Sequence, residues 1–154
     1  MSIRFLRELK LKQKPSNVSD FWQCKDHKIP KSPGVYLLIA KNVRFRYPAG
    51  RSSIYYIGQA KSLHKRLVKQ HHKYHRHVKG NRRLGDYLYE ARHEYGGTFG
   101  GRYCYIQTWQ RISPEKLEKK VIRAFMEQYH APPIANGAGI WGWVKKVSLR
   151  NPKK

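Results

Sequence analysis

Three short runs of β-branched and aromatic residues predict strands in this chain. The first covers 35–40 and follows a Ser-Pro-Gly turn, the second covers 54–57, and the third covers 102–109. The loop 41–53 joins the first two runs and contains Pro and Gly, so we expect these two strands to pair antiparallel although the loop is longer than a tight hairpin needs.

Stretches with apolar residues at helical spacing predict three helices. The first begins at Ser62 and is otherwise covered by Lys, Arg and His, the second covers 84–95, and the third begins with the capping pair Ser113-Pro114. Their apolar faces carry Leu63, Leu67 and Val68; Leu84, Tyr87, Leu88, Ala91 and Tyr95; and Leu117, Val121, Phe125 and Tyr129. The order β-β-α-α-β-α predicts a small α+β domain, with a mixed or antiparallel three-stranded sheet flanked by helices.

The chain divides into a basic N-terminal arm (1–31), the domain itself (32–136) and a basic C-terminal tail (137–154). The arm lacks the apolar core of a secretory signal, and we expect it to be a surface arm that touches nucleic acid. Organellar targeting stays open because the arm is rich in Lys and Arg and poor in acids. No run approaches the 18 apolar residues of a membrane span, so no membrane partner is expected.

Charge narrows the choice of partner. The 154 residues include 33 Lys and Arg against nine Asp and Glu, a net charge of +24, and no acidic residue lies between Asp26 and Asp86. Such a charge favours a polyanionic partner, and phosphate backbones bind Lys and Arg by releasing condensed counterions. The bare charge does not distinguish a binding protein from an enzyme.

Several site chemistries are absent from the sequence. Cys24 and Cys104 form neither a disulfide framework nor a metal cluster, and a single bridge between them stays open as an alternative. A reducing, cytoplasmic compartment is expected. No phosphate-binding Gly-x-x-x-x-Gly-Lys loop is present. His71 and His75 have helical i, i+4 spacing, but no carboxylate or thiol lies near them in sequence, which favours a basic face that contacts phosphate over a structural metal site.

A set of spaced residues points to a nuclease. Gly34-Val35-Tyr36 lies on the first predicted strand, Tyr56-Ile57-Gly58 on the second, Arg66 in the following helix, Glu118 on the last helix and Asn136 after its end. This arrangement resembles the GIY-YIG nuclease family, which includes the excision-repair nuclease subunit and homing endonucleases. The chain differs from the family pattern in having Val35 for the usual Ile, Gln59 where Lys is frequent, and a longer interval between the two tyrosines.

The resemblance implies a GIY-YIG-like fold and a divalent-metal-dependent endonuclease that hydrolyses phosphodiester bonds in DNA. It implies that Tyr36 is the general base, that Tyr56 orients water or phosphate, and that Asn136 ties the last turn to the wall of the active site. Arg66 has the planar, permanently charged fork suited to the scissile phosphate. Glu118 would hold one Mg²⁺ or Mn²⁺, with Glu115 and Glu127 as alternatives.

The remaining basic residues near these motifs are expected to contact nucleic acid: Arg44, Arg46, Arg51, Lys61, Lys65, His71, His72, Lys73 and Arg76. Phe45 and Tyr47 either stack on bases or anchor the long loop hydrophobically. DNA is favoured over RNA as the substrate. The alternative is a non-catalytic RNA-binding protein that uses the nuclease fold as a scaffold, for example in a ribosome-like particle. No separate recognition domain is visible, so specificity must come from loops, tails, a partner, or a homodimer or larger assembly.

Overall fold

The computed structural model describes residues 3–20, 28–72 and 101–136. In chain order its elements are α1 (Arg4–Glu8), β1 (Ser19–Asp20), β2 (Gly34–Ala40), β3 (Phe45–Tyr47), β4 (Gly50–Ser52), β5 (Ile54–Ala60), η3 (Lys65–His72), β6 (Gly101–Gln107) and α4 (Pro114–Tyr129). Among these described residues, no helix is long and apolar enough to cross a membrane.

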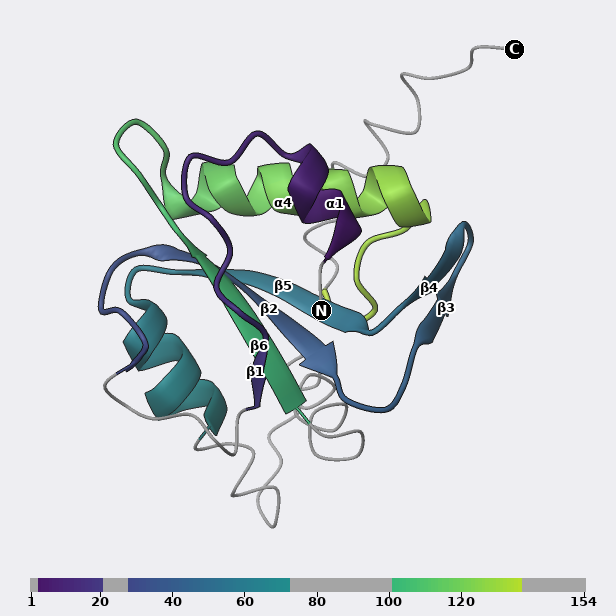
Figure 1. Cartoon of the computed structure of the whole chain (residues 1–154), viewed down its shortest axis with the longest axis horizontal. Coiled ribbons are helices and arrows are strands. Elements are labelled where there is room, and N and C mark those ends of the chain that lie inside the picture. Colours follow the sequence, from purple (N-terminus) through teal and green to yellow (C-terminus); the bar gives the residue numbers. More distant parts are fainter. Residues whose placement is uncertain (1–2, 21–27, 73–100, 137–154) are drawn as a thin grey trace, which may run out of the picture.

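The main sheet has four strands in the order β1-β6-β2-β5, and every adjacent pair is antiparallel (Figure 1). The predicted α+β class and the predicted antiparallel pair of the first two strands, β2 and β5, are therefore confirmed. The prediction of three strands was wrong, because β1 adds a fourth strand by pairing Ser19 with Tyr103. The loop 41–53 also forms a separate two-stranded sheet, β3–β4. Strands of two or three residues are too short to show an alternating pattern in the sequence.

Both faces of the central strand β2 are covered, which is why all seven of its residues are buried. Val35, Leu37 and Ile39 pack in a cluster with the apolar residues of α1 and α4, whereas Tyr36 and Leu38 pack in a second cluster with Leu63 and Leu67 beside η3. Figure 1 shows α1 and α4 on one side of the sheet and the teal helix η3 on the other. Alternation along one strand therefore assigns Tyr36 to the η3 face.

Helix α4 begins where its sequence signals predict and ends at Tyr129. The Ser113 hydroxyl accepts a hydrogen bond from the backbone N–H of Lys116, at 3.3 Å, and Pro114 occupies the first turn. His130 ends the helix in the left-handed conformation, with φ 60°. Leu117 and Phe125 are fully buried, so the predicted apolar face is the face that packs on the sheet.

The N-terminal segment differs from the surface arm that its composition suggests. Phe5 and Leu6 are buried, and the Phe5 ring meets Phe125 of α4 edge to face at 5.6 Å between centroids. The basic side chains of Arg4, Arg7 and Lys10 are exposed. The segment thus contributes apolar residues to the core while its cations remain at the surface.

The predicted helix from Ser62 is present as η3, whose hydrogen bonding is of the π type, rare in proteins and often found at functional sites. Leu63 and Leu67 are buried as expected. The remainder of this predicted helix, the predicted helix 84–95 and the tail 137–154 lie outside the described residues.

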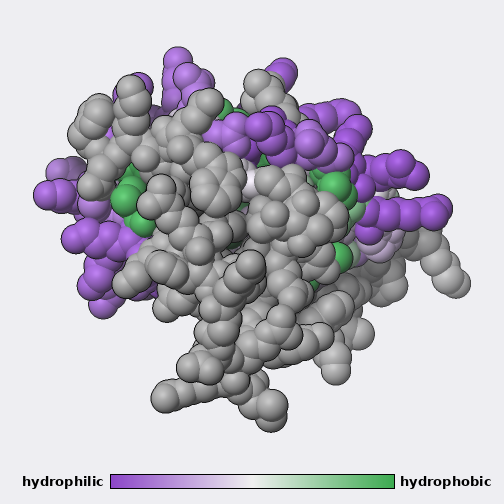
Figure 2. Space-filling model, turned by 90° about the horizontal axis from the view of Figure 1, so that it is seen from below, coloured by the Kyte–Doolittle hydropathy of each residue, from purple (hydrophilic) through white to green (hydrophobic). Residues whose placement is uncertain are grey.

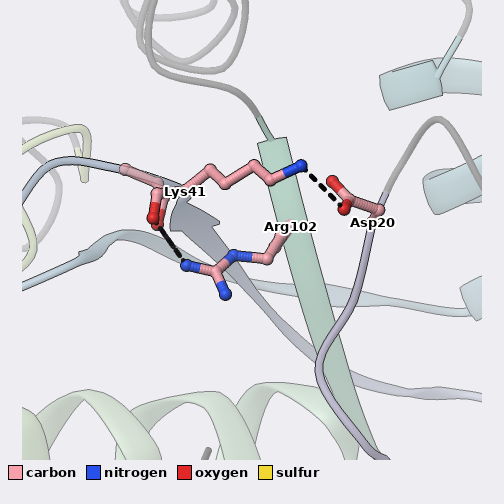
Figure 3. A network of polar contacts seen from close by, with 4 residues as sticks. Asp20, Lys41 and Arg102 are labelled. Atoms are coloured by element: carbon pink, nitrogen blue, oxygen red, sulfur yellow. Dashed lines mark hydrogen bonds and ion pairs between the residues drawn. The ribbon is translucent and has the colours of Figure 1, made fainter.

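A polar network closes the end of the sheet where β2 ends and β6 begins (Figure 3). Lys41 Nζ lies 3.3 Å from Asp20 Oδ2, and Arg102 Nη2 donates to the carbonyl oxygens of Ala40 at 3.3 Å and Lys41 at 2.8 Å. The network joins β1, β2 and β6, which are distant in sequence. We call this region the network end of the sheet.

Candidate active site

Tyr36 and Tyr56 meet over Gly58 at the opposite end of the sheet. Tyr36 pairs directly with Gly58 across β2 and β5, and the two tyrosine rings lie 5.9 Å apart between centroids. A β-carbon on Gly58 would lie 2.6 Å from Tyr56 Cε1 and 2.7 Å from the Tyr36 hydroxyl oxygen. Only glycine fits here, because any side chain would displace the tyrosine rings.

The other motif glycine is required by a close approach of three segments. A β-carbon on Gly34 would collide with the carbonyl oxygen of Ile106 and lie 2.7 Å from Leu63 Cδ1. Gly34 thus lets β2, β6 and the residues before η3 meet. Val35 and Ile57 point to the opposite face and are fully buried in the cluster under α4, so these two motif residues serve packing. We call this region, where β2 begins and β5 ends, the motif end of the sheet.

Asn136 binds the free edge of β5 with both ends of its side-chain amide. Its Oδ1 accepts from the Ile57 N–H at 3.0 Å, and its Nδ2 donates to the Ile57 carbonyl oxygen at 2.7 Å. The backbone N–H of Ala135 also donates to the carbonyl oxygen of Tyr55 at 2.8 Å. Since Ile57 separates Tyr56 from Gly58, Asn136 fixes the strand at the centre of the second motif.

Arg66 lies on the same face of the sheet as the tyrosines. The helix that carries it is positioned by two backbone hydrogen bonds: the N–H of Leu63 donates to Ser32 at 3.0 Å, and that of His64 donates to Pro30 at 2.9 Å. Leu67, the next residue, is fully buried in the tyrosine cluster. Arg66 itself is half-buried, on a helix whose neighbouring residue Leu67 packs in the cluster that contains both tyrosines.

Glu118 comes from the other face of the sheet. Helix α4 packs against β5 and β2, and Leu117 belongs to the cluster beneath it. Glu118 is half-buried and can reach the tyrosine face only around the edge strand β5. The structure therefore places the helix that carries Glu118 and the two tyrosines on opposite faces of the sheet.

The beginning of α4 lies close to the motif end. A hydrogen bond to its own backbone and one to Ser113 lower the pKa of the exposed Glu115, and the positive charges of Lys61 and Lys119 lower it further. Lys61 follows directly after β5. Glu127 is nine residues beyond Glu118, roughly 13 Å further along the helix. Of the three candidate glutamates, it is therefore the least suited to bind a metal at the motif end.

The structure separates the predicted nucleic-acid contacts into two groups. Arg44, Arg46 and Arg51 are exposed on β3 and β4 or just before them, whereas Lys61 and Lys65 are exposed at the other end of β5. His71 and His72 end η3, and Lys73 and Arg76 lie outside the described residues. Figure 2 shows described hydrophilic side chains along the margins of the face it presents, with a few hydrophobic residues visible beside them.

Two features became clear only from the structure: the role of Tyr47, for which the sequence left two interpretations open, and a surface stripe that was missed in the sequence. Tyr47 anchors the loop from within: it is buried, its hydroxyl donates to the Ile54 carbonyl oxygen at 2.9 Å, and it accepts from the Ile134 N–H at 3.2 Å. The structure thus supports the hydrophobic-anchor interpretation for Tyr47 over base stacking. The second is an exposed basic stripe on α4, formed by Lys116, Lys120 and Arg123, whose i, i+4, i+7 spacing was available as a signal.

Within residues 3–20, 28–72 and 101–136, no three His, Cys, Asp or Glu side chains form a group that could hold a metal ion. Any metal bound by the described residues would therefore use few protein ligands, as Mg²⁺ does when it keeps most of its waters. No family model, curated protein or solved structure matches the chain.

Proposed function

We propose that the protein is a divalent-metal-dependent endonuclease that hydrolyses phosphodiester bonds in DNA. The observation that carries the proposal is the meeting of Tyr36 and Tyr56 over Gly58, with the intervening Ile57 held by Asn136. Packing requirements alone explain the glycine, but they do not require two tyrosine hydroxyl groups at this end of the sheet.

The residues at the motif end have the functional groups that phosphodiester hydrolysis needs. The Arg66 guanidinium can bind two phosphoryl oxygens and offset the charge that develops on them. Tyr36 takes the proton from the attacking water, and Tyr56 orients that water or the phosphate. A phenol has an ordinary pKa near 10, so a base of this type needs positive charge close to its hydroxyl to favour the ionised form.

Glu118 is the residue proposed to hold Mg²⁺ or Mn²⁺, and Glu115 is the second choice at the same end of α4. A carboxylate oxygen is the ligand that these hard cations prefer. The metal would supply charge stabilisation on the phosphate and acidify a bound water.

One observation favours the alternative, a non-catalytic RNA-binding protein on the same scaffold. Tyr36 is only 1% exposed, whereas Tyr56 is 9% exposed. A general base must contact water, so catalysis by Tyr36 requires the side chains covering its hydroxyl to move. A binding protein would need no such movement, and its cations would act at the surface.

A cleavage assay on duplex, branched and single-stranded DNA, with Mg²⁺ and with EDTA, tests the proposal. We expect metal-dependent nicking by the wild type, and loss of at least about a hundredfold in rate for Arg66→Ala and for Glu118→Ala. Lys69→Ala is the matched control for Arg66, because Lys69 is exposed on the same helix. Glu127→Ala is the corresponding control on α4, and Glu115→Ala shows which glutamate binds the metal.

The two functions give opposite results in this assay. Absence of cleavage with any divalent ion, together with stable co-purification of a defined RNA, would establish the scaffold alternative. Full activity in both Arg66→Ala and Glu118→Ala would remove the proposed site even if the protein cuts DNA.

A further inference from the structure

The β3–β4 hairpin is firmly attached to the body of the domain. The Tyr47 ring lies 5.2 Å from Phe125 and 5.6 Å from Tyr129 between centroids, and the backbone N–H of Ala49 donates to the Tyr129 carbonyl oxygen at 3.2 Å. Phe45 meets the Tyr55 ring edge to face at 6.3 Å. Figure 1 shows the hairpin projecting past the end of the main sheet beside the end of α4.

This anchored hairpin holds like charges together. Arg46 and Arg51 occupy directly opposite positions across the two strands, and both are exposed. Arg44 Nη2 donates to the Arg51 carbonyl oxygen at 3.1 Å, which keeps a third guanidinium at the same place. Within the described part of the chain, neither Arg46 nor Arg51 takes part in an ion pair.

Such an arrangement is unfavourable in the isolated protein. Side chains directly opposite each other on paired strands have β-carbons about 5 Å apart, and like charges there are destabilising. A flexible loop would relieve the repulsion by separating the arginines, but the anchors of Tyr47, Ala49 and Phe45 prevent this. A bound chain of anions would neutralise the charges, and arginine forks match phosphate oxygens.

We infer that the β3–β4 hairpin binds the sugar–phosphate backbone of the nucleic-acid substrate at a second point, distinct from the candidate active site. This inference rests on the proposed function only in taking nucleic acid as the substrate. The seven residues of β5 separate the hairpin from the motif end by roughly 20 Å. At 3.4 Å per nucleotide step along one strand, this corresponds to about six nucleotides. The substrate therefore extends at least that far on one side of the bond that is cut.

Binding measured in EDTA tests the inference without any cleavage. The probe is a fluorescein-labelled 30-base-pair DNA duplex, with an RNA duplex of the same length in parallel, and affinity is measured against salt concentration. For Arg46→Gln/Arg51→Gln we expect about a tenfold or greater loss of affinity near 0.1 M salt, and a salt slope smaller by about 1.8. Lys116→Gln/Lys120→Gln removes the same charge from the exposed face of α4 and is the control.

Two further measurements distinguish a lost DNA contact from a folding defect and define how long a duplex the hairpin contact requires. Arg51→Glu replaces the repulsion with an attraction to Arg46, so its Tm should equal or exceed that of the wild type while DNA affinity falls. The second measurement uses duplexes with a central nick in place of the bond that is cut. Where the duplex extends fewer than about six nucleotides beyond the nick, the wild type and the Arg46→Gln/Arg51→Gln variant should bind with equal affinity.

Equal losses in the hairpin and α4 double variants would overturn the inference, because binding would then depend on net charge alone. So would an unchanged salt slope, or tighter binding to phosphatidylserine vesicles than to either duplex. If the protein fails to cut DNA but the hairpin variant still loses affinity, the hairpin inference stands and the endonuclease proposal is rejected. If the protein cuts DNA and the hairpin variant binds as tightly as the wild type, the endonuclease proposal stands and the hairpin inference is rejected.

Discussion

The cations at the two ends of the main sheet differ in the partners they have within the chain. At the network end, Lys41 is paired with the Asp20 carboxylate and Arg102 donates to two backbone carbonyl oxygens. At the motif end, Lys65 and Arg66 form no ion pair with any acid in the described part of the chain. Within the described residues, the cations at the network end are therefore satisfied by partners in the chain, whereas Lys65 and Arg66 at the motif end have no acidic partner.

The largest effect is expected from Gly58→Ala, which removes the space that the two tyrosine rings share. The new β-carbon would come within 2.8 Å of atoms in both Tyr36 and Tyr56, so one ring or the strand must shift. We expect a loss of about 1–3 kcal/mol in the free energy of unfolding, measured by urea denaturation. Cleavage should fall as well. Gln59→Ala, at the next position, should have little effect on either, and normal activity in Gly58→Ala would contradict the proposed placement of the tyrosines.

Asn136→Ala is expected to come next. It leaves the N–H and carbonyl oxygen of Ile57 without the partners they have in the structure, at a partly buried site. The expected destabilisation is about 1–3 kcal/mol by thermal or urea unfolding. Ile134→Ala is the control, because that side chain is 49% exposed. Equal stability of the Asn136 variant and the wild type would show that water replaces the amide at this edge.

A smaller effect is expected at the network end. Asp20→Asn keeps the shape of the side chain but removes the charge that pairs with Lys41, whose side chain is half exposed. We expect a loss of up to about 1 kcal/mol in stability, with DNA binding unchanged. A marked loss of DNA binding in this variant would break the distinction between structural and substrate-facing cations.

The smallest effect concerns Glu115, whose pKa is lowered in the folded protein. A lowered folded-state pKa contributes stability above the ordinary carboxyl pKa, and this contribution disappears as the pH falls below about 4.5 through the folded-state value. Glu115→Gln should therefore lower Tm slightly at pH 7 and leave it unchanged near pH 2, as followed by circular dichroism. A larger effect in acid than at neutral pH would have the wrong sign.

The sequence predicted those parts of the fold that depend on local signals. The runs that became β2 and β5 contain consecutive β-branched and aromatic residues, and α4 begins at the Ser113-Pro114 pair that predicted it. In contrast, β1 depends on a pairing between Ser19 and Tyr103, and no local pattern in either residue indicates the other. The repulsive arginine pair of β3–β4 was also unpredictable, since it exists only in the observed register.

For the candidate site, the sequence identified residue types but not their relative placement. Tyr36, Gly58 and Asn136 were singled out from spacing, and the structure supplies the contacts that join them. The burial of Tyr36 and the position of Glu118 on the opposite face of the sheet depend on strand alternation and helix packing together. Neither strand alternation across the sheet nor helix packing can be derived from the spacing of residues along the chain.

The amide of Asn136 also has a consequence for how the chain reaches its native state. Ile57 and Asn136 are 79 positions apart, so the outer edge of β5 has no side-chain amide to bind until nearly the whole domain has been synthesised. Until then β5 is an unpaired edge strand, able to pair with the same strand of another molecule. Because this edge is closed late, aggregation competes with folding during synthesis and refolding. The rate of aggregation should rise with protein concentration.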